Sequence, residues 1–536
     1  MKTATLLSLF LISFLSTTLI AQNRSETVNI TWGEEEKGSR QLFVSELIDA
    51  DEEHVLVMKR SLKTYKTFKP GQIIARYDQD MRLDVEKELV LETNKREREL
   101  SFTTNLNDGI QVFSSFNNSK LKKHFLFVEN IDKKTLSPTS SLVKIAEIDY
   151  TGNSRYRIGN FDGVLSRDES KLLVYYNLPY QKKAKEKFGF HVFDQQMNLI
   201  WNRNVTLPYR DDLFAIKDYE VDNEGNVFIL GQVFTSSKHV GKGKNSKPNY
   251  KYVVLSYSSD GENLKVYPIQ VQAKFLKDMK MALDTDNNIL CGGFYSMLNR
   301  GNVKGSFFLK IDADSKEITS KTFKAFGIDF ITQNMSKGVA KRNKNRNSKG
   351  KNVELYDYNF DDIVLDKNGN VFLIGEQFYS YSQTVTSTNT SGLTKSSTIH
   401  YFIYNDIIVV KMSPEGEIEW AEKIAKRQKS QNDGGYYSSY ILSLANDKLN
   451  FIFNDHEANL NYKGVGKVAN YFQNKNSITS LVSLDKSTGK QTREALFSAR
   501  EAETLISPRL SKHISDTEIL LYGKKGKKYR LARLEF

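Results

Sequence analysis

The sequence has few of the residues that cross-link or interrupt a chain. It contains one cysteine, Cys291, and 8 prolines among 536 residues. A single cysteine excludes an intramolecular disulfide framework, so a stable fold must rest on its buried core. Beyond the N-terminal segment, no apolar run reaches the roughly 20 residues that a membrane-spanning helix needs. These absences argue against a disulfide-stabilised scaffold and a multi-span membrane protein.

Motifs that carry chemistry are also missing. The sequence has no Gly-x-Ser-x-Gly, no Walker pattern, no His-Glu-x-x-His and no pattern typical of a nucleic-acid reader. Gly241–Lys247 is rich in glycine and lysine, but it lacks the strand-loop-helix setting of a phosphate loop. Cys291 lies in an apolar stretch and is expected to be a buried, inert thiol. Seven single histidines are expected at surface or strand positions, namely His54, His124, His191, His239, His400, His456 and His513.

Residues that favour β-structure are abundant. Hydrophobic residues make up 39% of the chain and aromatic residues 12%, with 27 Tyr and 32 Phe. This composition supplies a large packed core and excludes a disordered chain. The formal net charge is +13, which favours weak attraction to anionic polymers or surfaces.

The first 21 residues have the order of a secretory signal peptide. Lys2 gives a positive start, the stretch from Ala4 to Ile20 is largely apolar, and Ala21 precedes a plausible cleavage point. The alternatives are a membrane anchor or a buried strand. We expect residues 1–21 to be removed and the mature protein to be exported to the periplasm, the cell surface or the medium, without a membrane span.

One β-hairpin recurs along the chain. Two apolar strands flank a turn of Asp, Asn and Gly, residues that tolerate positive φ. The clearest copies are Val221–Gly231, Leu283–Gly293 and Leu365–Gly375. Weaker copies are Ile48–Met58, Leu106–Phe116, Leu165–Tyr176, Leu444–Phe453 and Ile514–Gly523, which makes eight.

A second hairpin follows most of the first ones. Examples are Phe190–Val205, Phe307–Phe323, Ile407–Ile424 and Leu481–Leu496. Two hairpins make a four-stranded unit, and the units are somewhat longer than the roughly 40 to 50 residues of common propeller blades. The pattern predicts an all-β fold, a β-propeller of seven to eight blades. We assign residues 22–536 to this one domain.

The ends of the chain predict how the propeller closes. The last unit stops at Leu531–Phe536, one strand short of the others, and Glu26–Trp32 supplies a strand at the other end. Trp32 stands in the same sequence context as Trp201 and Trp420, the other two tryptophans. Pairing of the terminal strands would close the ring and leave no free edge. The alternative is that the three tryptophans are placed by chance.

The run Asp406–Trp420, with the hairpin Asp366–Gly375 before it, resembles the bacterial β-propeller repeat abbreviated SBBP. This resemblance implies a propeller fold and an exported location, and it brings no fixed activity. The turn Leu484–Lys490 is similar to the repeats of quinoprotein-like propellers.

Polar insertions interrupt the repeat near residues 331–355, 379–400 and 425–440. We expect Ser336–Lys351 to be a mobile basic loop, because its composition cannot bury much apolar surface. It is either a contact for an anionic ligand or a solvated loop. Its cations are Lys337, Lys341, Arg342, Lys344, Arg346, Lys349 and Lys351. The other two insertions are rich in tyrosine, which suits either binding or ordinary strand structure.

Two Asp-rich segments cluster oxygens that suit calcium, Asp284–Asn288 and Asp312–Asp314. Hairpin turns use the same residues for backbone reasons, so we predict no cofactor and keep calcium as an alternative. The function that we expect is a binding or scaffolding module for an anionic polysaccharide, a cell-surface component or another envelope protein. The alternative is a propeller enzyme, either a polysaccharide hydrolase or lyase or a quinone-dependent oxidoreductase. Carboxylate pairs for sugar chemistry are defined by spatial separation, so the sequence does not decide between binding and catalysis.

Overall fold

The structure is a computed structural model of the chain. It describes residues 28–38, 42–62, 71–93, 96–107, 109–150, 158–179, 183–235, 248–259, 264–269, 274–298, 302–315, 317–388, 390–391, 394–413, 415–464, 466–472 and 476–536. The predicted signal peptide, Gly241–Lys247 and His239 lie outside the described residues.

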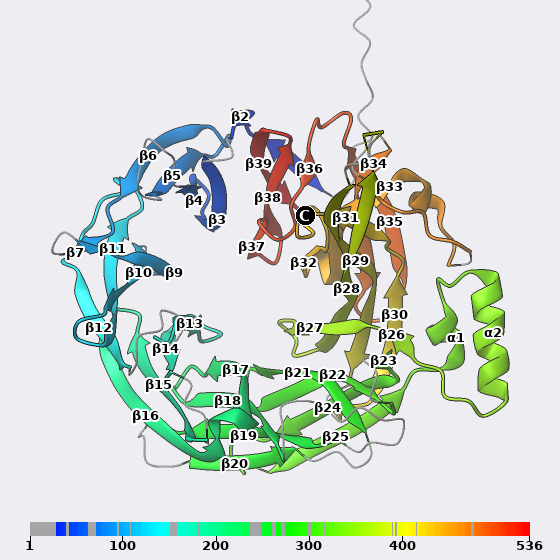
Figure 1. Ribbon diagram of the computed structural model, residues 1–536, viewed down its shortest axis with the longest axis horizontal. Helices are drawn as coiled ribbons and strands as arrows, with labels where there is room; N and C mark the ends of the chain where they lie inside the picture. Colours follow the sequence, from blue (N-terminus) through cyan, green and yellow to red (C-terminus); the bar gives the residue numbers. More distant parts are fainter. Residues whose placement is uncertain are drawn as a thin grey trace, which may run out of the picture.

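In this part of the chain, eight antiparallel sheets of at least four strands stand around one axis, which makes a β-propeller (Figure 1). Each sheet is one blade, and its strands follow one another outward from the axis in chain order, except that β1 is the outermost strand of blade 8. Blade 1 has β3 (Leu42–Ala50), β4 (His54–Ser61), β5 (Gly71–Asp78) and β6 (Leu83–Leu89). Blade 2 has β9 (Glu99–Leu106), β10 (Gly109–Asn118), β11 (Lys123–Asp132) and β12 (Val143–Asp149). Blade 3 has β13 (Phe161–Leu165), β14 (Lys171–Asn177), β15 (Lys185–Asp194) and β16 (Leu199–Arg210). Blade 4 has β17 (Phe214–Val221), β18 (Val227–Phe234), β19 (Tyr250–Tyr257) and β20 (Leu264–Ile269).

The second half of the ring continues the pattern with additions. Blade 5 has β21 (Phe275–Leu283), β22 (Ile289–Ser296), β24 (Gly305–Ile311) and β25 (Ile318–Ala325). Blade 6 has β27 (Tyr358–Leu365), β28 (Val371–Thr388), β29 (Thr394–Met412) and β30 (Ile418–Ile424), and β31 (Gln428–Gln431) pairs with β29. Blade 7 has β32 (Ile441–Ser443), β33 (Lys448–His456), β34 (Ser477–Asp485) and β35 (Gln491–Ser498). Blade 8 has β36 (Leu505–Ile506), β37 (Lys512–Ser515), β38 (Glu518–Lys525), β39 (Lys528–Glu535) and β1 (Asn29–Trp32).

Short pairs of strands complete the list. They are β2 (Glu36–Lys37), which pairs with β39, then β7 (Glu92–Thr93) with β8 (Arg96–Glu97), and β23 (Asn302–Val303) with β26 (Leu355–Tyr356). Three 3-10 turns lie at Asp211–Leu213, Ala445–Asp447 and Glu457–Asn461. Each of the eight hairpins predicted from the sequence joins the first two strands of a blade, or β37 and β38 in blade 8. The propeller prediction is therefore confirmed, with eight blades.

Burial follows the position of a strand in its blade. Every residue of β22 is buried, whereas the outer strand β16 alternates between exposed and partly buried residues for most of its length. A middle strand lies between two neighbouring blades, so both of its faces need apolar side chains. The core is accordingly a series of clusters between blades, such as the one that joins Tyr252 and Val254 of blade 4 to Met281 and Phe307 of blade 5.

The recurring turn has a simple chemical basis. Asp222 accepts hydrogen bonds from the backbone N–H groups of Glu224 and Asn226, and the Asn226 amide donates to the second Asp222 oxygen at 2.7 Å. The side-chain oxygen of Asn226 accepts from the N–H of Ser259, which lies after the third strand. The pairs Asp284 with Asn288 and Asp366 with Asn370 repeat the first set of contacts. An Asp and an Asn four residues later therefore fix the first hairpin of these blades.

The ring closes through its terminal strands. Asn29–Trp32 pairs antiparallel with Ala532–Glu535, which confirms the predicted closure over the described residues. All three tryptophans occupy the outermost strand of a blade, in β1, β16 and β30. The indole N–H groups of Trp201 and Trp420 donate to carbonyl groups of the following blade, those of Gly225 and Lys486. The shared sequence context of the tryptophans thus reflects one structural position.

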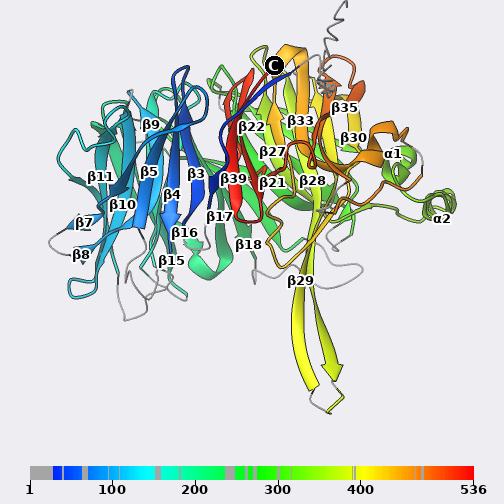
Figure 2. The same ribbon diagram turned by 90° about the horizontal axis from the view of Figure 1, so that it is seen from above.

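Two features leave the ring. Helices α1 (Ile328–Thr332) and α2 (Lys337–Ser348) stand at its outer rim between blades 5 and 6 (Figure 1). The ends of β28 and β29 extend beyond the propeller as a ribbon, which we call the arm (described residues 379–388, 390–391 and 394–403; Figure 2). The strand β31 pairs with β29 at the base of the arm, and the arm is two-stranded beyond that point. Most of the described residues of the insertion near 379–400 are thus regular β-structure. Among the described residues, no helix is long and apolar enough to cross a membrane.

The expected loop Ser336–Lys351 is wrong in its local structure, because most of it forms α2. Lysine, arginine and alanine favour helix formation without needing burial. Ser336 stands at the N-cap position without a side-chain capping hydrogen bond, and Gly350, with φ 66°, follows the last helical turn as a left-handed stop. The expected lack of burial is confirmed, since α2 contains no buried residue.

Candidate functional site

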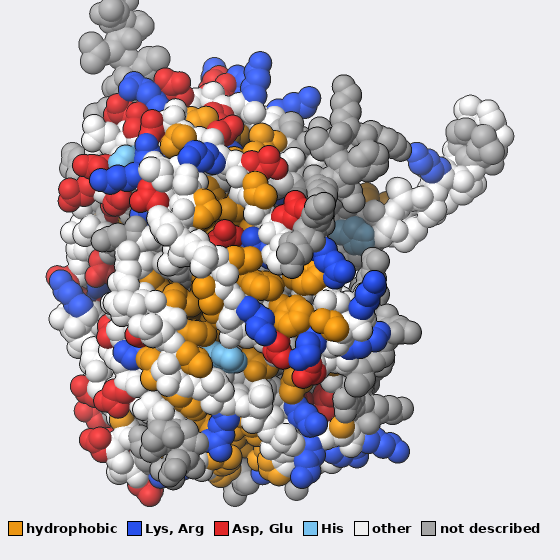
Figure 3. All heavy atoms as spheres, turned by 90° about the vertical axis from the view of Figure 1, so that its left-hand side faces the viewer, with side chains coloured by type: hydrophobic (Ala, Val, Ile, Leu, Met, Phe, Trp, Pro, Cys, Tyr) orange, Lys and Arg blue, Asp and Glu red, His pale blue; other side chains and the backbone are white. Residues whose placement is uncertain are grey.

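Helix α2 gathers cations on the rim of the propeller. Five of the seven predicted cations lie within the helix, and Lys349 and Lys351 follow it. Among the described residues, only Lys344 of these seven has a carboxylate within ion-pair distance, that of Asp329 at 2.6 Å. The face shown in Figure 3, over blades 1 to 3, carries Asp and Glu side chains among its Lys and Arg side chains. The uncompensated charge on α2 therefore sets the helix apart from that face.

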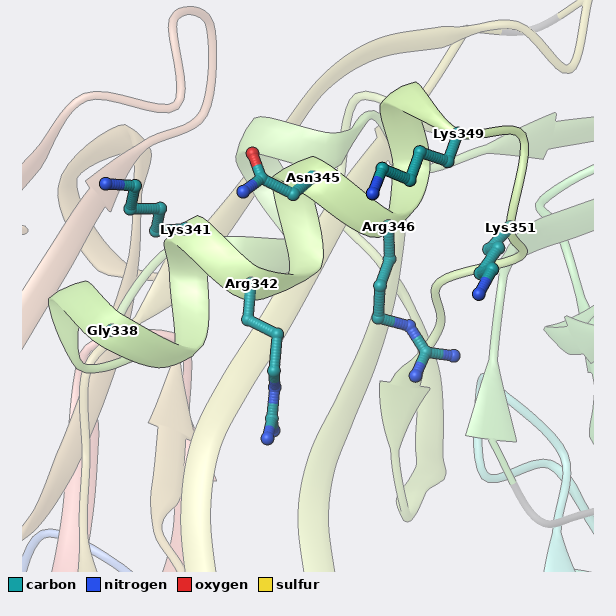
Figure 4. Close-up of a pocket in the computed structure, with 7 residues that line it drawn as sticks. All are labelled: Gly338, Lys341, Arg342, Asn345, Arg346, Lys349 and Lys351. Carbon is teal, nitrogen blue, oxygen red and sulfur yellow. The ribbon is translucent and has the colours of Figure 1, made fainter.

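Five of the cations line a hollow of about 420 Å³ along α2. Arg342 and Arg346, one helical turn apart, extend from the same side of α2, and Lys349 and Lys351 lie beside them (Figure 4). Lys341, Asn345 and Gly338 complete the lining, so no acidic residue is among the described residues that form it. Lys337 and Lys344 lie elsewhere on the helix. The arrangement offers charge and guanidinium N–H donors to an anion.

Helix α1 anchors this surface to the ring. Ile331 is buried between blades 5 and 6, and the ring of Phe330 lies 4.7 Å from that of Phe326. The ammonium group of Lys423, in β30, donates to the carbonyl oxygen of Phe330 at 2.8 Å and lies 5.0 Å from its ring. The Tyr462 hydroxyl donates to Asn334, between the two helices. These contacts attach the helix pair to the propeller at defined points.

A second constellation lies at the axis of the ring. In six blades, the innermost strand carries one residue at the same place in the first hairpin. Counted along the strand pairing from the residue pair that flanks the turn, it belongs to the third pair away from the turn. These residues are Glu46, Thr103, Asp162, Asp218, Lys280 and Asp362. We call them the axial layer. A bulge in β17 and β27 just before the aspartate resets the register at this point.

Contacts within and between blades hold the axial layer. Thr103 donates to Glu46 at 3.0 Å across blades 2 and 1. Asp218 accepts from the N–H of Tyr219, and its other oxygen lies 3.4 Å from the N–H of Met281 in blade 5. Lys280 occupies the position that Asp218 and Asp362 hold in the blades on either side. A cation therefore stands between two carboxylates at the same level.

Two carboxyl groups beside this layer have strongly raised pKa values. Loss of hydration raises the pKa of Glu220 to about 8, and the charges of Asp218 and Asp362 add to the shift. Loss of hydration likewise raises the pKa of Asp361 to about 7, with a further contribution from Glu376. Both side chains are partly accessible to water, but protein atoms make up most of their surroundings. At neutral pH, Glu220 therefore holds its proton in a setting that contains further carboxyl groups, which is a combination suited to acid–base chemistry.

The other candidate residues, which are turn aspartates, the cysteine and a histidine, serve the fold. Asp284 accepts from the N–H groups of Asp286 and Asn288, and Asp312 accepts from that of Ser315, so these carboxylates stabilise their own turns. Cys291 is fully buried in β22, where loss of hydration raises the pKa of its thiol to about 12. Burial lowers the pKa of His191 to about 4. In the part of the chain that the structure describes, no three His, Cys, Asp or Glu side chains form a group that could hold a metal ion.

The sequence analysis missed the axial layer. Its members are separated by as many as 316 residues, from Glu46 to Asp362. A usable signal was present in blades 4 and 6, where an aspartate stands four residues before the turn aspartate, as Asp218 before Asp222 and Asp362 before Asp366. In blade 5, Lys280 stands four residues before the turn aspartate Asp284. A search for the repeated aspartate would therefore not have found the lysine between the two acidic positions.

Comparisons with known proteins show no family for this chain. No family model and no curated protein sequence matches the chain. The polysaccharide lyase Uly1 is 10% identical over 94% of this chain and 99% of its own, with a TM-score of 0.37. The WD40 domain of SCAP from fission yeast is 8% identical over 96% of this chain and 98% of its own, also with a TM-score of 0.37. The β-propeller domain of the Trilobed protease from Pyrococcus furiosus is 13% identical over 72% of this chain and 96% of its own, with a TM-score of 0.29. This chain is similar to these proteins in its propeller fold.

Proposed function

We propose that the protein is an exported propeller that binds an anionic polysaccharide through α2 and the hollow beside it. The observation that carries this proposal is the group of five cations, Lys341, Arg342, Arg346, Lys349 and Lys351, that line one hollow without an acidic neighbour in its lining. The N-terminal sequence supports export, because it has the order of a signal peptide. A rigid ring with a charged rim is suited to binding an extended polymer.

Attraction of this kind depends on salt. Exposed charges are screened over about 8 Å at physiological ionic strength and over about 3 Å at 1 M. The test is the salt concentration that elutes the mature protein from an immobilised polygalacturonate column. The variant Lys341→Gln/Arg342→Gln/Arg346→Gln removes three cations from the hollow, and it should elute at clearly lower salt than the wild type.

A matched control separates local charge from net charge. Lys120, Arg167 and Arg500 are exposed cations on other parts of the ring. The variant Lys120→Gln/Arg167→Gln/Arg500→Gln loses the same charge, and we expect it to elute close to the wild type. Equal behaviour of the two triple variants would remove α2 from the function and leave the +13 charge as a property of the whole surface.

A second candidate function is polysaccharide cleavage at the ring axis. The specific observation is Glu220, whose raised pKa of about 8 makes it a proton donor at neutral pH, next to Asp218 on the same strand. Hydrolases and lyases need such acid–base groups. The test is the release of reducing ends, or of unsaturated products, from a panel of acidic polysaccharides. Glu220→Gln should abolish a reaction that the exposed turn variant Glu169→Gln retains, and no product from the wild-type protein would exclude cleavage of those substrates.

A further inference from the structure

An exposed group of aromatic side chains lies where the arm leaves the propeller. Tyr381 stacks on its cross-strand partner Tyr401, with ring centroids 4.8 Å apart and planes 20° from parallel. Tyr356, from β26, meets Tyr379 edge to face at 5.7 Å. Tyr379 and Tyr381 are two residues apart in β28, so both point to the same face of the ribbon. We call these four residues the tyrosine platform.

Two of the four platform residues are open to solvent, and Tyr379 and Tyr401 are half-buried. Tyr356 is 56% exposed and Tyr381 is 43% exposed, and these two are the only tyrosines among the strongly exposed large hydrophobic residues of the described chain. Farther along the arm, the same face carries Ile399 and Val385, which lie at the alternating positions of the two strands. Val385 is exposed and Ile399 is half-buried. Exposed apolar side chains gathered on one face are a mark of a binding surface.

Cations border the platform. The Lys429 ammonium group lies 4.4 Å from the Tyr401 ring centre and 6.0 Å from that of Tyr381. Burial raises the pKa of the Tyr379 hydroxyl, and the charges of Arg427 and Lys429 oppose this rise. No carboxylate is among the described groups that shift this pKa. Asp357, the neighbour of Tyr356 in the chain, is paired with Lys277 at 3.1 Å. The platform therefore combines flat apolar rings with positive charge.

The platform also lies within reach of α2. Lys351 lines the hollow, and only five residues of chain lead from it to Tyr356, so the two Cα atoms are at most about 18 Å apart. A polymer held by the cations of the hollow can therefore extend over the platform.

We propose that the tyrosine platform is a binding subsite for the sugar rings of an acidic polysaccharide. The C–H face of a sugar ring matches the face of a tyrosine ring, its hydroxyl groups match the phenol oxygen, and its carboxylate or sulfate group matches Lys429. The strands that carry Tyr379, Tyr381 and Tyr401 are paired, so the rings are held in place before the ligand arrives. This inference rests on the proposed function in one respect, since α2 and the platform would hold the same polymer.

Three other polymers separate the contributions. Polyphosphate has the charge without sugar rings, dextran has sugar rings without the charge, and an oligothymidylate has charge and stacking bases. Binding of each, and of polygalacturonate oligosaccharides, is measured by biolayer interferometry on the intact mature protein at one ionic strength. The variant is Tyr356→Ala/Tyr381→Ala, in which both truncated side chains are exposed in the wild type. Leu199→Ala is the control, because Leu199 is 48% exposed on β16 in blade 3.

The tyrosine variant should lose about tenfold or more in polygalacturonate affinity, the scale expected when stacking on an aromatic side chain is removed. Its polyphosphate affinity should stay within about twofold of the wild type, since the hollow is intact. Lys429→Gln should weaken polygalacturonate binding and leave any weak dextran binding unchanged. The control should match the wild type with every polymer.

Three results would overturn the inference. Unchanged polygalacturonate affinity in the tyrosine variant would show that the rings do not contact the ligand. An equal loss for polyphosphate would make the tyrosines a structural support for α2. A larger loss for oligothymidylate than for polygalacturonate would assign the platform to nucleic-acid bases. Failure of the proposed function gives a different result from failure of this inference. In that case the α2 triple variant binds polygalacturonate as tightly as the wild type, whereas the tyrosine variant still loses affinity.

Discussion

Replacing Asp361 by asparagine should make the protein more stable at neutral and alkaline pH, with little effect near pH 4. Asp361 lies in β27 and accepts a hydrogen bond from the Tyr440 hydroxyl at 2.9 Å. Loss of hydration raises the pKa of its carboxyl group from 3.8 to about 7. An asparagine amide keeps an oxygen for Tyr440 and carries no charge, so the variant removes the cost of ionising this site.

The sign and size follow from proton linkage. Because the folded state holds the proton more tightly than the unfolded state, stability falls as pH rises from about 4 to about 7 and then levels off. A shift of about 3 pKa units corresponds to about 4 kcal/mol at 1.36 kcal/mol per unit. Since water still reaches part of the side chain, we expect a gain of about 2 to 4 kcal/mol for Asp361→Asn at pH 8.

The assay is urea denaturation at pH 4, 6 and 8 and constant ionic strength, with the free energy of unfolding taken from each midpoint and slope. The control is Asp286→Asn, in an exposed turn of blade 5, which should keep the pH dependence of the wild type. A stability difference between Asp361→Asn and the wild type that is the same at all three pH values would refute the assignment of a raised pKa to Asp361.

Two further predictions concern the closure of the ring and a buried ion pair. Trp32→Ala should lower the free energy of unfolding by about 2 kcal/mol, which is less than for a fully buried tryptophan. The reason is that Trp32 is half-buried against Phe497 and Arg530. A change below about 0.5 kcal/mol in urea denaturation would show that ring closure adds little stability. Lys426→Met should cost about 3 to 5 kcal/mol, because it leaves the Glu376 carboxylate buried without its cation. The double variant Lys426→Met/Glu376→Gln should recover most of that loss, and a double-variant cost equal to the sum of the single ones would contradict the pairing.

Local chemistry explains why the hairpins were predictable. A turn such as Asp222 to Asn226 is closed by hydrogen bonds within five residues, and the apolar strands on each side have to be buried wherever they lie. Ser336–Lys351 was expected to be a loop because its composition cannot bury much apolar surface. A segment without burial can still form a helix, so this expectation was wrong. Half of the twelve residues of α2 are lysine, arginine or alanine, which favour a helix, and Gly350 ends it.

The sequence by itself determined the blades, their number within one, the strand that closes the ring and the seven cations of the rim. These properties depend on residues that are close along the chain, or on an apolar pattern that repeats. Only the tertiary structure decided which side chains share a site. The axial layer depends on the register of six separate blades, and a one-residue shift in any of them would turn its side chain to the other face. The tyrosine platform likewise needs β26, β28 and β29 to meet at the base of the arm. The pKa values of Glu220 and Asp361 also come from folding, since hydration is lost only when neighbouring blades surround them.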